Sequence, residues 1–458
     1  MPPARPLGRG FGAHTEWVGA VREPPRGTDR PIDPLVPILD LSENGAGDEA
    51  SSSPPEPELA PGRGRRRRAH HRLRWAALAF VVAIAPVTYS YARALTGPGY
   101  DSVAARSVEW LRDHRMGGVV DFAERKWFAS HQARVGGTPD AHVLTPSVTD
   151  GAGQPSTTAT TAPARPARVA PTARAVSSFT DRLGPPAPVR SPAPDPFPGE
   201  GGWLPLGPPI HGAPGAYITS TRPDAIHLSS VVAVAWFDPH AVAFRQFPGV
   251  WIPGAPWDRP PEVPAADRSH LIATFSGGFR LGSSHGGMLL GGQVLRNLRG
   301  GAATFAVDRK AVPAIGAWGP DLSPTAPYDS VRQNLDLIVR GGRPNPALIT
   351  DPNRLWGFTG PANHEFVWRS GAGVLANGAL VWIGGPGLSI SSLADLFVRL
   401  GAVRAMQLDI NHEWVQFNTY RTVNGAVHGT RLLKDMRGPD DRWLSEDTRD
   451  FFAVFARD

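Results

Sequence analysis

An uncharged run of 18 residues, Trp75–Ala92, constrains this chain more than any other stretch of its sequence. Arg74 and Arg93 close the run on its two sides. As an α-helix it would be roughly 27 Å long, close to the thickness of the hydrocarbon core of a bilayer. Pro86 lies inside the run, and membrane helices tolerate proline better than soluble helices do. The sequence therefore predicts a single transmembrane anchor over residues 75–95.

A cleaved signal peptide and a buried soluble helix are the alternatives to an anchor. About seventy residues precede the run, and Ser90–Leu95 lacks a small-x-small cleavage site, so we favour an uncleaved anchor. Seven arginines lie just before it: Arg63, Arg65, Arg66, Arg67, Arg68, Arg72 and Arg74. By the positive-inside rule they predict a cytoplasmic N-terminus, a single pass through the plasma membrane and an extracytoplasmic C-terminal part. We also expect these arginines to contact lipid headgroups.

Much of the N-terminal half is too rich in Pro, Gly, Ser and Thr to bury a core. The prolines crowd into residues 2–61 and 146–214. Apolar residues at helical spacing over 101–128 predict two short helices separated at Gly117-Gly118. We therefore expect five parts: a disordered tail (1–74), the anchor (75–95), membrane-proximal helices (96–130), a flexible linker (131–199) and one folded domain (200–458).

The net charge of +6 does not indicate a nucleic-acid partner, because the seven arginines before the anchor account for it. The rest of the chain is close to neutral, so we predict no binding to nucleic acid. The chain has no cysteine, which excludes disulfides, thiol nucleophiles and zinc sites with cysteine ligands.

Beyond Glu200, short apolar runs separated by Gly, Pro and Asn predict β-strands. These runs are residues 231–238, 271–279, 302–308 and 335–342. Two apolar segments around Asn377-Gly378 predict a tight hairpin, and 390–400 follows as a helix with a serine cap and Gly401 at its end. Residues 414–420 and 451–457 predict a last pair of strands. We expect an α+β domain with a large mixed, mainly antiparallel sheet and few helices.

Several motifs occur in an order typical of a known family. They are Ser276-Gly277-Gly278-Phe279, "RSGAG" from Arg369, the Asn377-Gly378 turn, and "LADLFVRLGAVRAMQLD" ending at Asp409. Over about residues 216–458 the domain resembles the phosphodiester glycosidase family. The chain departs from the family pattern twice. Ser276 stands where an Asn is usual, and Ile410–Trp414 replaces a Gly/Ser-rich turn. We therefore expect a divergent branch with a different substrate.

The resemblance implies cleavage of a sugar from a phosphodiester, with a phosphate monoester as leaving group. Such a reaction needs a carboxylate to stabilise an oxocarbenium-like sugar and a cation to neutralise the phosphate. Asp409, at the polar end of an apolar strand, is the predicted carboxylate, with a capping acid as the alternative. Arg369 is the predicted phosphate ligand, because a guanidinium matches phosphate well, or else a structural arginine. We expect Asn411 to share the face of Asp409 and bind sugar hydroxyls, or to hold a turn.

Four further side chains and one glycine pair complete the candidate site. His412 and Glu413 invite an acid–base or metal interpretation, but one His and two acids so close cannot all face one point along a strand. We predict no cofactor, with a divalent metal as the lesser alternative. His364 and Glu365 are further acid–base or substrate-binding candidates. Gly277-Gly278 predicts a tight turn that brings N–H groups to a ligand or lets two strands meet.

The sequence thus favours a membrane-tethered extracytoplasmic hydrolase that acts on a sugar-1-phosphodiester in cell-envelope glycans or their precursors. A catalytically inactive glycan-binding module is the alternative, because the domain is rich in tryptophan. A purely structural envelope protein is a third interpretation. The hydrolase hypothesis expects Asp409 and Arg369 to meet across an open hollow.

Overall fold

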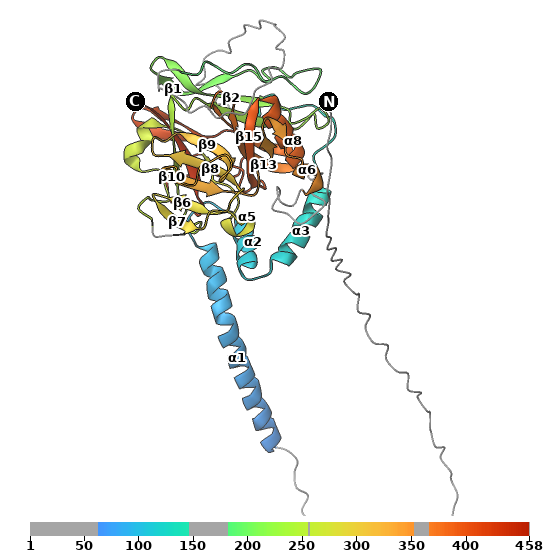
Figure 1. The fold of residues 1–458 in the computed structure, drawn as a ribbon. Helices are drawn as coiled ribbons and strands as arrows, with labels where there is room; N and C mark the ends of the chain where they lie inside the picture. The colour runs from blue at the N-terminus through green and yellow to red at the C-terminus, as the bar shows by residue number, and fades with distance from the viewer. Residues whose placement is uncertain (1–62, 146–181, 255–256, 352–365, 458) are drawn as a thin grey trace, which may run out of the picture. The chain divides into compact units, whose positions relative to one another are not determined.

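The computed structural model describes residues 63–145, 182–254, 257–351 and 366–457 (Figure 1). Within these ranges one helix, α1 (Arg63–Leu95), contains a segment long and apolar enough to cross a membrane. That segment, Arg74–Leu95, has 22 residues, which is consistent with a membrane anchor or a signal sequence. Residues 1–62 of the predicted disordered tail (1–74) fall outside the described residues, as does the middle of the predicted linker. Residues 63–74, also predicted to be disordered, form the first part of α1 instead.

Two helices follow α1, as the sequence predicts. They are α2 (Val103–Asp113) and α3 (Gly117–Ser130). The side chain of Ser102 caps α2 by accepting a hydrogen bond from the Ala105 N–H at 3.1 Å. The break falls just before the predicted position, and Gly117 begins the second helix instead of ending the first.

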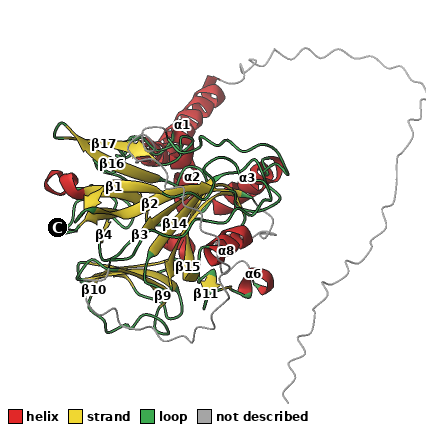
Figure 2. Cartoon of the chain, turned by 90° about the horizontal axis from the view of Figure 1, so that it is seen from above, coloured by secondary structure: helices red, strands yellow, loops and turns green. Residues whose placement is uncertain are grey.

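The strands of the described residues form three sheets, and every pairing between these named strands is antiparallel (Figure 2). The eight-stranded sheet contains, in spatial order, β1 (Leu204–Ile210), β2 (Ala213–Thr221), β3 (Val232–Phe237), β14 (Leu380–Leu388), β13 (Val367–Leu375), β15 (Ala402–Ile410), β11 (Val339–Arg340) and β12 (Arg343–Pro344). The β10 sheet contains β7 (Gln293–Arg296), β6 (Met288–Leu290), β10 (Tyr328–Gln333), β8 (Ala303–Asp308) and β9 (Pro313–Ala317). The β5 sheet contains β17 (Ala426–Arg431), β16 (Phe417–Val423), β5 (Leu271–Ser276), β18 (Phe451–Ala456) and β4 (Val242–Phe247).

The large, mainly antiparallel sheet and the small number of helices confirm the sequence analysis, which did not foresee the two additional five-stranded sheets. The last two predicted strands, β16 and β18, do not pair with each other. Each pairs with β5, which lies between them. Besides α1, α2, α3 and α8 (Ile390–Arg399), the described residues form three short helical turns: η1 (Ala265–His270), α5 (Leu281–Ser284) and α6 (Ala347–Thr350).

The hairpin and the helix after it form as predicted. Strands β13 and β14 join at Asn377-Gly378, where Gly378 has a φ of +89° that favours glycine. Ser389 then caps α8 (Ile390–Arg399), and the chain leaves the helix through Gly401. Strand β15 returns beside β13, while α8 packs on the same sheet (Figure 2).

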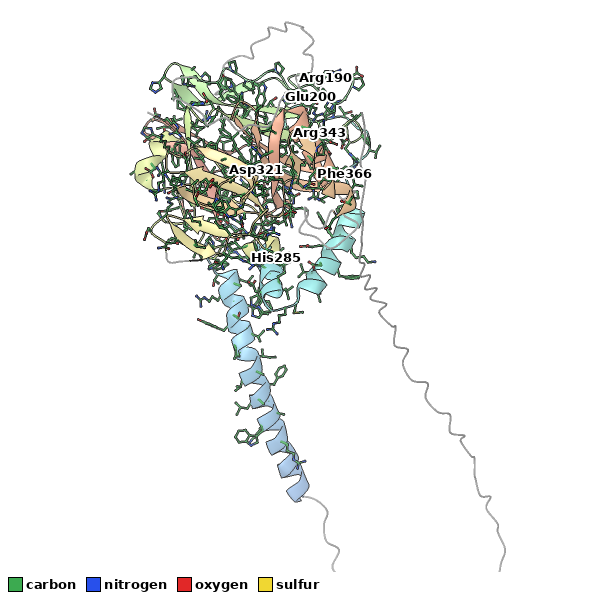
Figure 3. The ribbon with its side chains drawn as sticks, viewed as in Figure 1. Arg190, Glu200, His285, Asp321, Arg343 and Phe366 are labelled. Carbon is green, nitrogen blue, oxygen red and sulfur yellow. The ribbon has the colours of Figure 1, made fainter. Side chains whose placement is uncertain are left out.

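The eight-stranded sheet is buried on both faces. Along β3, Val232, Val234 and Trp236 belong to the cluster that contains the apolar face of α8. Ala233, Ala235 and Phe237 belong to the cluster shared with the other two sheets. This double burial explains why the sequence reads as continuous apolar runs instead of alternating polar and apolar residues. Side chains fill the space between the sheets throughout the folded domain (Figure 3).

Both described ends of the predicted linker pack on the folded domain. Val143 and Leu144 are buried in the main core cluster, and Leu144 bridges to Leu433. At the other end, Arg182 forms an ion pair with Asp238 at 3.0 Å. These ends therefore belong to the packed domain, because they bury apolar surface and pair charges.

Candidate active site

Strand ends from all three sheets meet around Asp409, the penultimate residue of β15. Asn334, just after β10, bridges to β15 through its side-chain amide, which donates to the carbonyl oxygens of Gln407 at 2.6 Å and Leu408 at 2.8 Å. Strand β5 is tied to the same place, because the Phe279 N–H donates to the Leu408 carbonyl at 3.1 Å. We call this region the three-sheet junction. It comprises Gly277, Gly278, Arg332, Asn334, Asp409, Arg449 and Asp450.

Asp409 is only 1% exposed, and the junction surrounds its carboxyl group. One oxygen, Oδ1, lies 3.5 Å from Nη1 of Arg449. The other, Oδ2, has no hydrogen-bond partner among the described residues. Burial raises the pKa of Asp409 to about 7, while Arg449 and Arg332 act in the opposite direction. This carboxyl group therefore changes charge near neutral pH, which suits acid–base or electrostatic work at an active site.

Arg449 is the cation of the junction that is nearest to Asp409. Its guanidinium lies over the ring of Trp414, 3.4 Å from the ring centroid. It also forms an ion pair with Glu109 of α2. Burial opposes the charge of Arg449, but Glu109 and Asp409 outweigh it and raise the pKa of the guanidinium. Arg449 thus remains a cation between two carboxylates and an aromatic face.

A second buried pair, Arg332 with Asp450, supports the junction. Nε of Arg332 lies 2.8 Å from Oδ2 of Asp450, and both side chains are essentially unexposed. Gln246 donates to the same Asp450 oxygen at 3.1 Å, and Nη1 of Arg332 donates to the Gln333 carbonyl at 2.9 Å. This pair is held by several hydrogen bonds and joins the β10 sheet to the β5 sheet, so its role is structural.

Arg369 does not meet Asp409 in the way the sequence analysis expected. It is fully buried in β13, where Nε donates to the Leu388 carbonyl at 2.9 Å and Nη1 to Oε1 of Gln407 at 2.8 Å. The side chain therefore ties β13 to β14 and β15. Arg449 takes the place beside the carboxylate, and Asp409 is enclosed instead of facing an open hollow.

The glycine pair allows the end of β5 to lie against the junction. A Cβ on Gly277 would lie 2.2 Å from Oδ2 of Asp450, and the Gly277 N–H donates to the Asp450 carbonyl at 3.0 Å. Gly278 has a φ of +122°, and a Cβ there would lie 3.2 Å from the Leu408 carbonyl oxygen. The close approach of two strands explains both glycines, and the Gly277 N–H points to Asp450, not toward a ligand.

The residues after β15 form a turn in which Asn411, His412 and Glu413 make their side-chain contacts outside the three-sheet junction. Asn411 has a φ of +94°, and its side-chain oxygen accepts from the Glu413 N–H at 3.0 Å. The expectation that Asn411 shares the face of Asp409 was wrong, because the strand ends at Ile410. The ring of His412 stacks on the ring of Trp368, with 4.2 Å between the two ring centroids, and the imidazole also contacts the Asp435 carbonyl. Burial lowers the pKa of His412. Glu413 pairs with Arg437.

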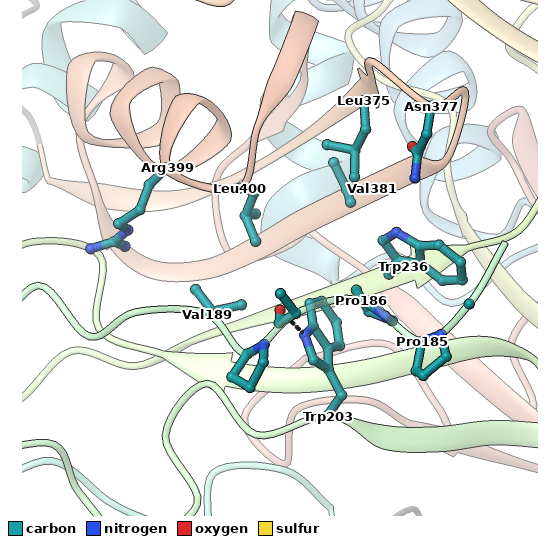
Figure 4. A pocket seen from close by; sticks show the side chains of 13 residues that line it. Pro185, Pro186, Val189, Trp203, Trp236, Leu375, Asn377, Val381, Arg399 and Leu400 are labelled. Atoms are coloured by element: carbon teal, nitrogen blue, oxygen red, sulfur yellow. Dashed lines mark hydrogen bonds between the residues drawn. The ribbon is translucent and has the colours of Figure 1, made fainter. Parts of the chain in front are cut away.

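Other candidate sites lie apart from the junction or outside the described residues. His364 and Glu365 fall outside them. No group of three or more His, Cys, Asp or Glu that could hold a metal ion occurs among the residues the structure describes. A pocket of about 430 Å³ is lined by Pro185, Trp203, Trp236 and Arg399 among others, and it shares no residue with the junction (Figure 4).

Sequence reasoning found Asp409 but missed the residues that surround it. Arg449-Asp450 directly precedes the apolar strand "FFAVFA", which is the same signal that singled out Asp409: charged residues at the tip of an apolar strand. Arg332 and Asn334 likewise lie at the end of β10. A search for charged and polar residues at both ends of every predicted strand would have identified the residues that surround Asp409.

No family model matches the chain, and no curated protein matches it. Among solved structures, the chain is similar to the catalytic domain of zebrafish N-acetylglucosamine-1-phosphodiester alpha-N-acetylglucosaminidase, auto-inhibited by its pro-peptide. The two are 13% identical with a TM-score of 0.36, over 55% of this chain and 87% of that one. A hypothetical protein from Synechocystis is 12% identical with a TM-score of 0.37, over 55% of this chain and 64% of that one. A putative exported protein from Burkholderia pseudomallei is 12% identical with a TM-score of 0.25, over 50% of this chain and 74% of that one. At these identities the likeness concerns the fold alone.

Proposed function

We propose that this protein is a membrane-tethered hydrolase that cleaves a sugar-1-phosphodiester, with the three-sheet junction as its active site. One observation carries the proposal: a buried carboxyl group, Asp409, has a pKa near 7 and lies beside the guanidinium of Arg449. Perturbed carboxyl groups next to a specific cation are typical of active sites. The motif order around Asp409, which resembles that of phosphodiester glycosidases, supports the same function.

The reaction would break the anomeric C–O bond of the sugar. The electron pair of that bond leaves with the phosphate oxygen, and a water oxygen bonds to the anomeric carbon. One proton of the water stays on the new sugar hydroxyl and the other passes to the departing phosphate, so the products are a free sugar and a phosphate monoester. Ionised Asp409 stabilises the positive charge that develops on the sugar, and Arg449 faces the departing phosphate. Because Asp409 must be ionised, we expect activity to rise with pH through about 7.

The anchor helix and its arginines support the rest of the proposal. With the N-terminus in the cytoplasm and a single pass through the plasma membrane, the folded domain would act on cell-envelope glycans or their precursors outside the cell. Nucleic acid is not a proposed partner.

The proposal is tested with the full-length chain purified in detergent micelles. Its substrates are a panel of alkyl phosphodiesters of different hexose 1-phosphates, and the measurement is the release of free sugar. Asp409→Asn should abolish release, and Asp395→Asn, which changes an exposed carboxylate on α8, should leave it unchanged. Equal release by wild type and Asp409→Asn would contradict the proposal. Retained binding with no turnover over long incubation would favour the glycan-binding module.

A further inference from the structure

Helix α2 lies against the candidate active site through two carboxylates on one of its faces. Glu109 pairs with Arg449, and Asp113, one turn further on, pairs with Arg280 at 2.7 Å. Residues four apart in a helix lie on the same face, so the two carboxylates are neighbours on the surface of α2. Arg280 directly follows the Gly277-Gly278-Phe279 turn. Both arginines that α2 contacts are therefore part of the junction or next to it.

The segment before α2 is attached to the same region. The carboxylate of Asp101 accepts a hydrogen bond from Oγ1 of Thr448, and its Oδ1 lies 3.5 Å from Nη2 of Arg442. Thr448 precedes Arg449 in the chain. Residues 101–113 thus contact the folded domain at three acidic positions, and all three contacts involve residues beside or within the junction.

Charge explains why α2 is held there. Burial opposes the ionisation of Glu109, but Arg449 and then Arg280 outweigh burial, so the pKa of Glu109 is lowered. Glu109 is therefore an anion at neutral pH that faces two guanidinium groups. An anion held by a pair of arginines next to an aromatic ring has the chemistry of a bound phosphate or carboxylate ligand.

We propose that Arg449 and Arg280 form an anion-binding subsite that α2 occupies with Glu109 and Asp113, so that α2 and the phosphate group of a substrate compete for it. The inference deepens the proposed function and rests on it for the identity of the anion as a sugar-linked phosphate. Departure of α2 therefore frees these two guanidinium groups, of which Arg449 lies beside Asp409.

The local ion pairs make this exchange feasible. When Glu109 leaves, Arg449 keeps Asp409 as a partner at 3.5 Å, so no guanidinium is left buried without a carboxylate. When Asp101 leaves, Arg442 keeps Asp447 at 2.8 Å. The Asp113 side chain is already 57% exposed, so its pair with Arg280 is weak and easily broken. An arriving phosphate supplies negative charge and hydrogen-bond acceptors to the guanidinium groups in place of the carboxylates.

The competition predicts a measurable change in affinity for inorganic phosphate. If only a small fraction of molecules has α2 displaced, the apparent dissociation constant is the intrinsic one divided by that fraction. Glu109→Gln removes the negative charge that competes for Arg449. We expect this variant of the full-length chain, in detergent micelles, to bind inorganic phosphate about tenfold or more tightly than wild type, as measured by calorimetric titration.

Three further variants complete the experiment. Asp113→Asn should tighten phosphate binding to a smaller extent. Glu109→Gln combined with Arg449→Gln should lose the gain. Glu262→Gln is the matched control, because Glu262 is paired at 3.9 Å with Arg268, away from α2, and it should bind phosphate like wild type.

An unchanged or weaker phosphate affinity in folded Glu109→Gln would overturn the inference and indicate that α2 is a permanent structural part. If Glu109→Gln does not fold, Asp113→Asn decides, and no gain in that variant would overturn the inference. Other results distinguish a failure of the proposed function from a failure of this inference. Tighter phosphate binding without sugar release by any variant would retain the subsite and reject the hydrolase. Sugar release at equal rates by wild type and Glu109→Gln would retain the hydrolase and reject the subsite.

Discussion

Two regions of this protein bury polar side chains in opposite ways. In the hairpin–helix region (β13, β14 and α8, residues 367–399), Ser389 and Ser392 satisfy each other through a capping box with bonds of 3.0 and 2.9 Å. In the three-sheet junction and against it, Oδ2 of Asp409, Oδ1 of Asn334 and Oε1 of Gln246 have no hydrogen-bond partner among the described residues. The first region is built from neighbours in sequence, and the second brings together strand ends that are far apart in the chain.

The difference indicates what each region is for. A buried polar group without a partner costs about 1–3 kcal/mol of stability, so a cluster of such groups persists where function requires it. In the hairpin–helix region the turn residue, the cap and the apolar face all favour the observed fold and contribute stability, and Nε of Arg399 is the buried polar atom there that has no hydrogen-bond partner among the described residues. The junction holds a carboxyl group in an environment that disfavours its charge. Substitutions in the two regions should therefore change stability in opposite directions.

The largest expected effect is in the hairpin–helix region. Phe397 is fully buried in α8 and packs directly over Gly371 and Gly373 of β13. Phe397→Ala should lower the free energy of unfolding by about 3–5 kcal/mol, because it removes a large side chain and leaves a cavity. Chemical denaturation of the full-length chain measures the change. Phosphate affinity of the folded variant should be unaffected, and a loss of affinity would show that the two regions are coupled.

The second-largest expected effect is in the junction, where substitution of Asp409 should raise the free energy of unfolding instead of lowering it. The pKa of Asp409 in the folded protein is about 7, above the value of about 3.9 in an unfolded chain. The folded state therefore binds more protons between about pH 4 and 7, and the contribution of Asp409 to stability is lost as pH rises through that window.

Asp409→Asn removes this dependence on pH. The variant should be more stable than wild type at pH 8, by an amount on the order of a few kcal/mol, and the difference should vanish near pH 4. Denaturation curves at the two pH values measure it. A variant that is less stable than wild type at pH 8 would show that Asp409 supports the fold in its charged form.

The smallest effect is at the helix cap. Ser389→Ala removes the side-chain oxygen that accepts from the Ser392 N–H, and it should cost about 1 kcal/mol. Thermal or chemical denaturation measures this loss, and Ser389→Asp should restore most of it because Asp also caps helices well. An Asp variant no more stable than the Ala variant would indicate that packing, not capping, explains Ser389.

The contrast between the two regions also explains how much the sequence could predict. The Asn377-Gly378 hairpin and α8 depend on residues within about twenty positions, so their signals are local. The division into three sheets depends on long-range pairing, such as β5 between β16 and β18, and no local pattern specifies it. Asp409 was identified because it ends an apolar strand. Its partner Arg449 and the carboxylate of Glu109 were not, since those two residues are 340 positions apart.

The account depends most on the charge state of Asp409, and that state can be measured directly. The side-chain carboxyl carbon of Asp409 is assigned by ¹³C NMR as the aspartate signal that is missing from Asp409→Asn, and its chemical shift is followed against pH in the full-length protein. We predict a titration midpoint near pH 7. A midpoint at the ordinary value for aspartate, about 4, would contradict the account, because Asp409 would then be an ordinary charged residue of a structural ion pair.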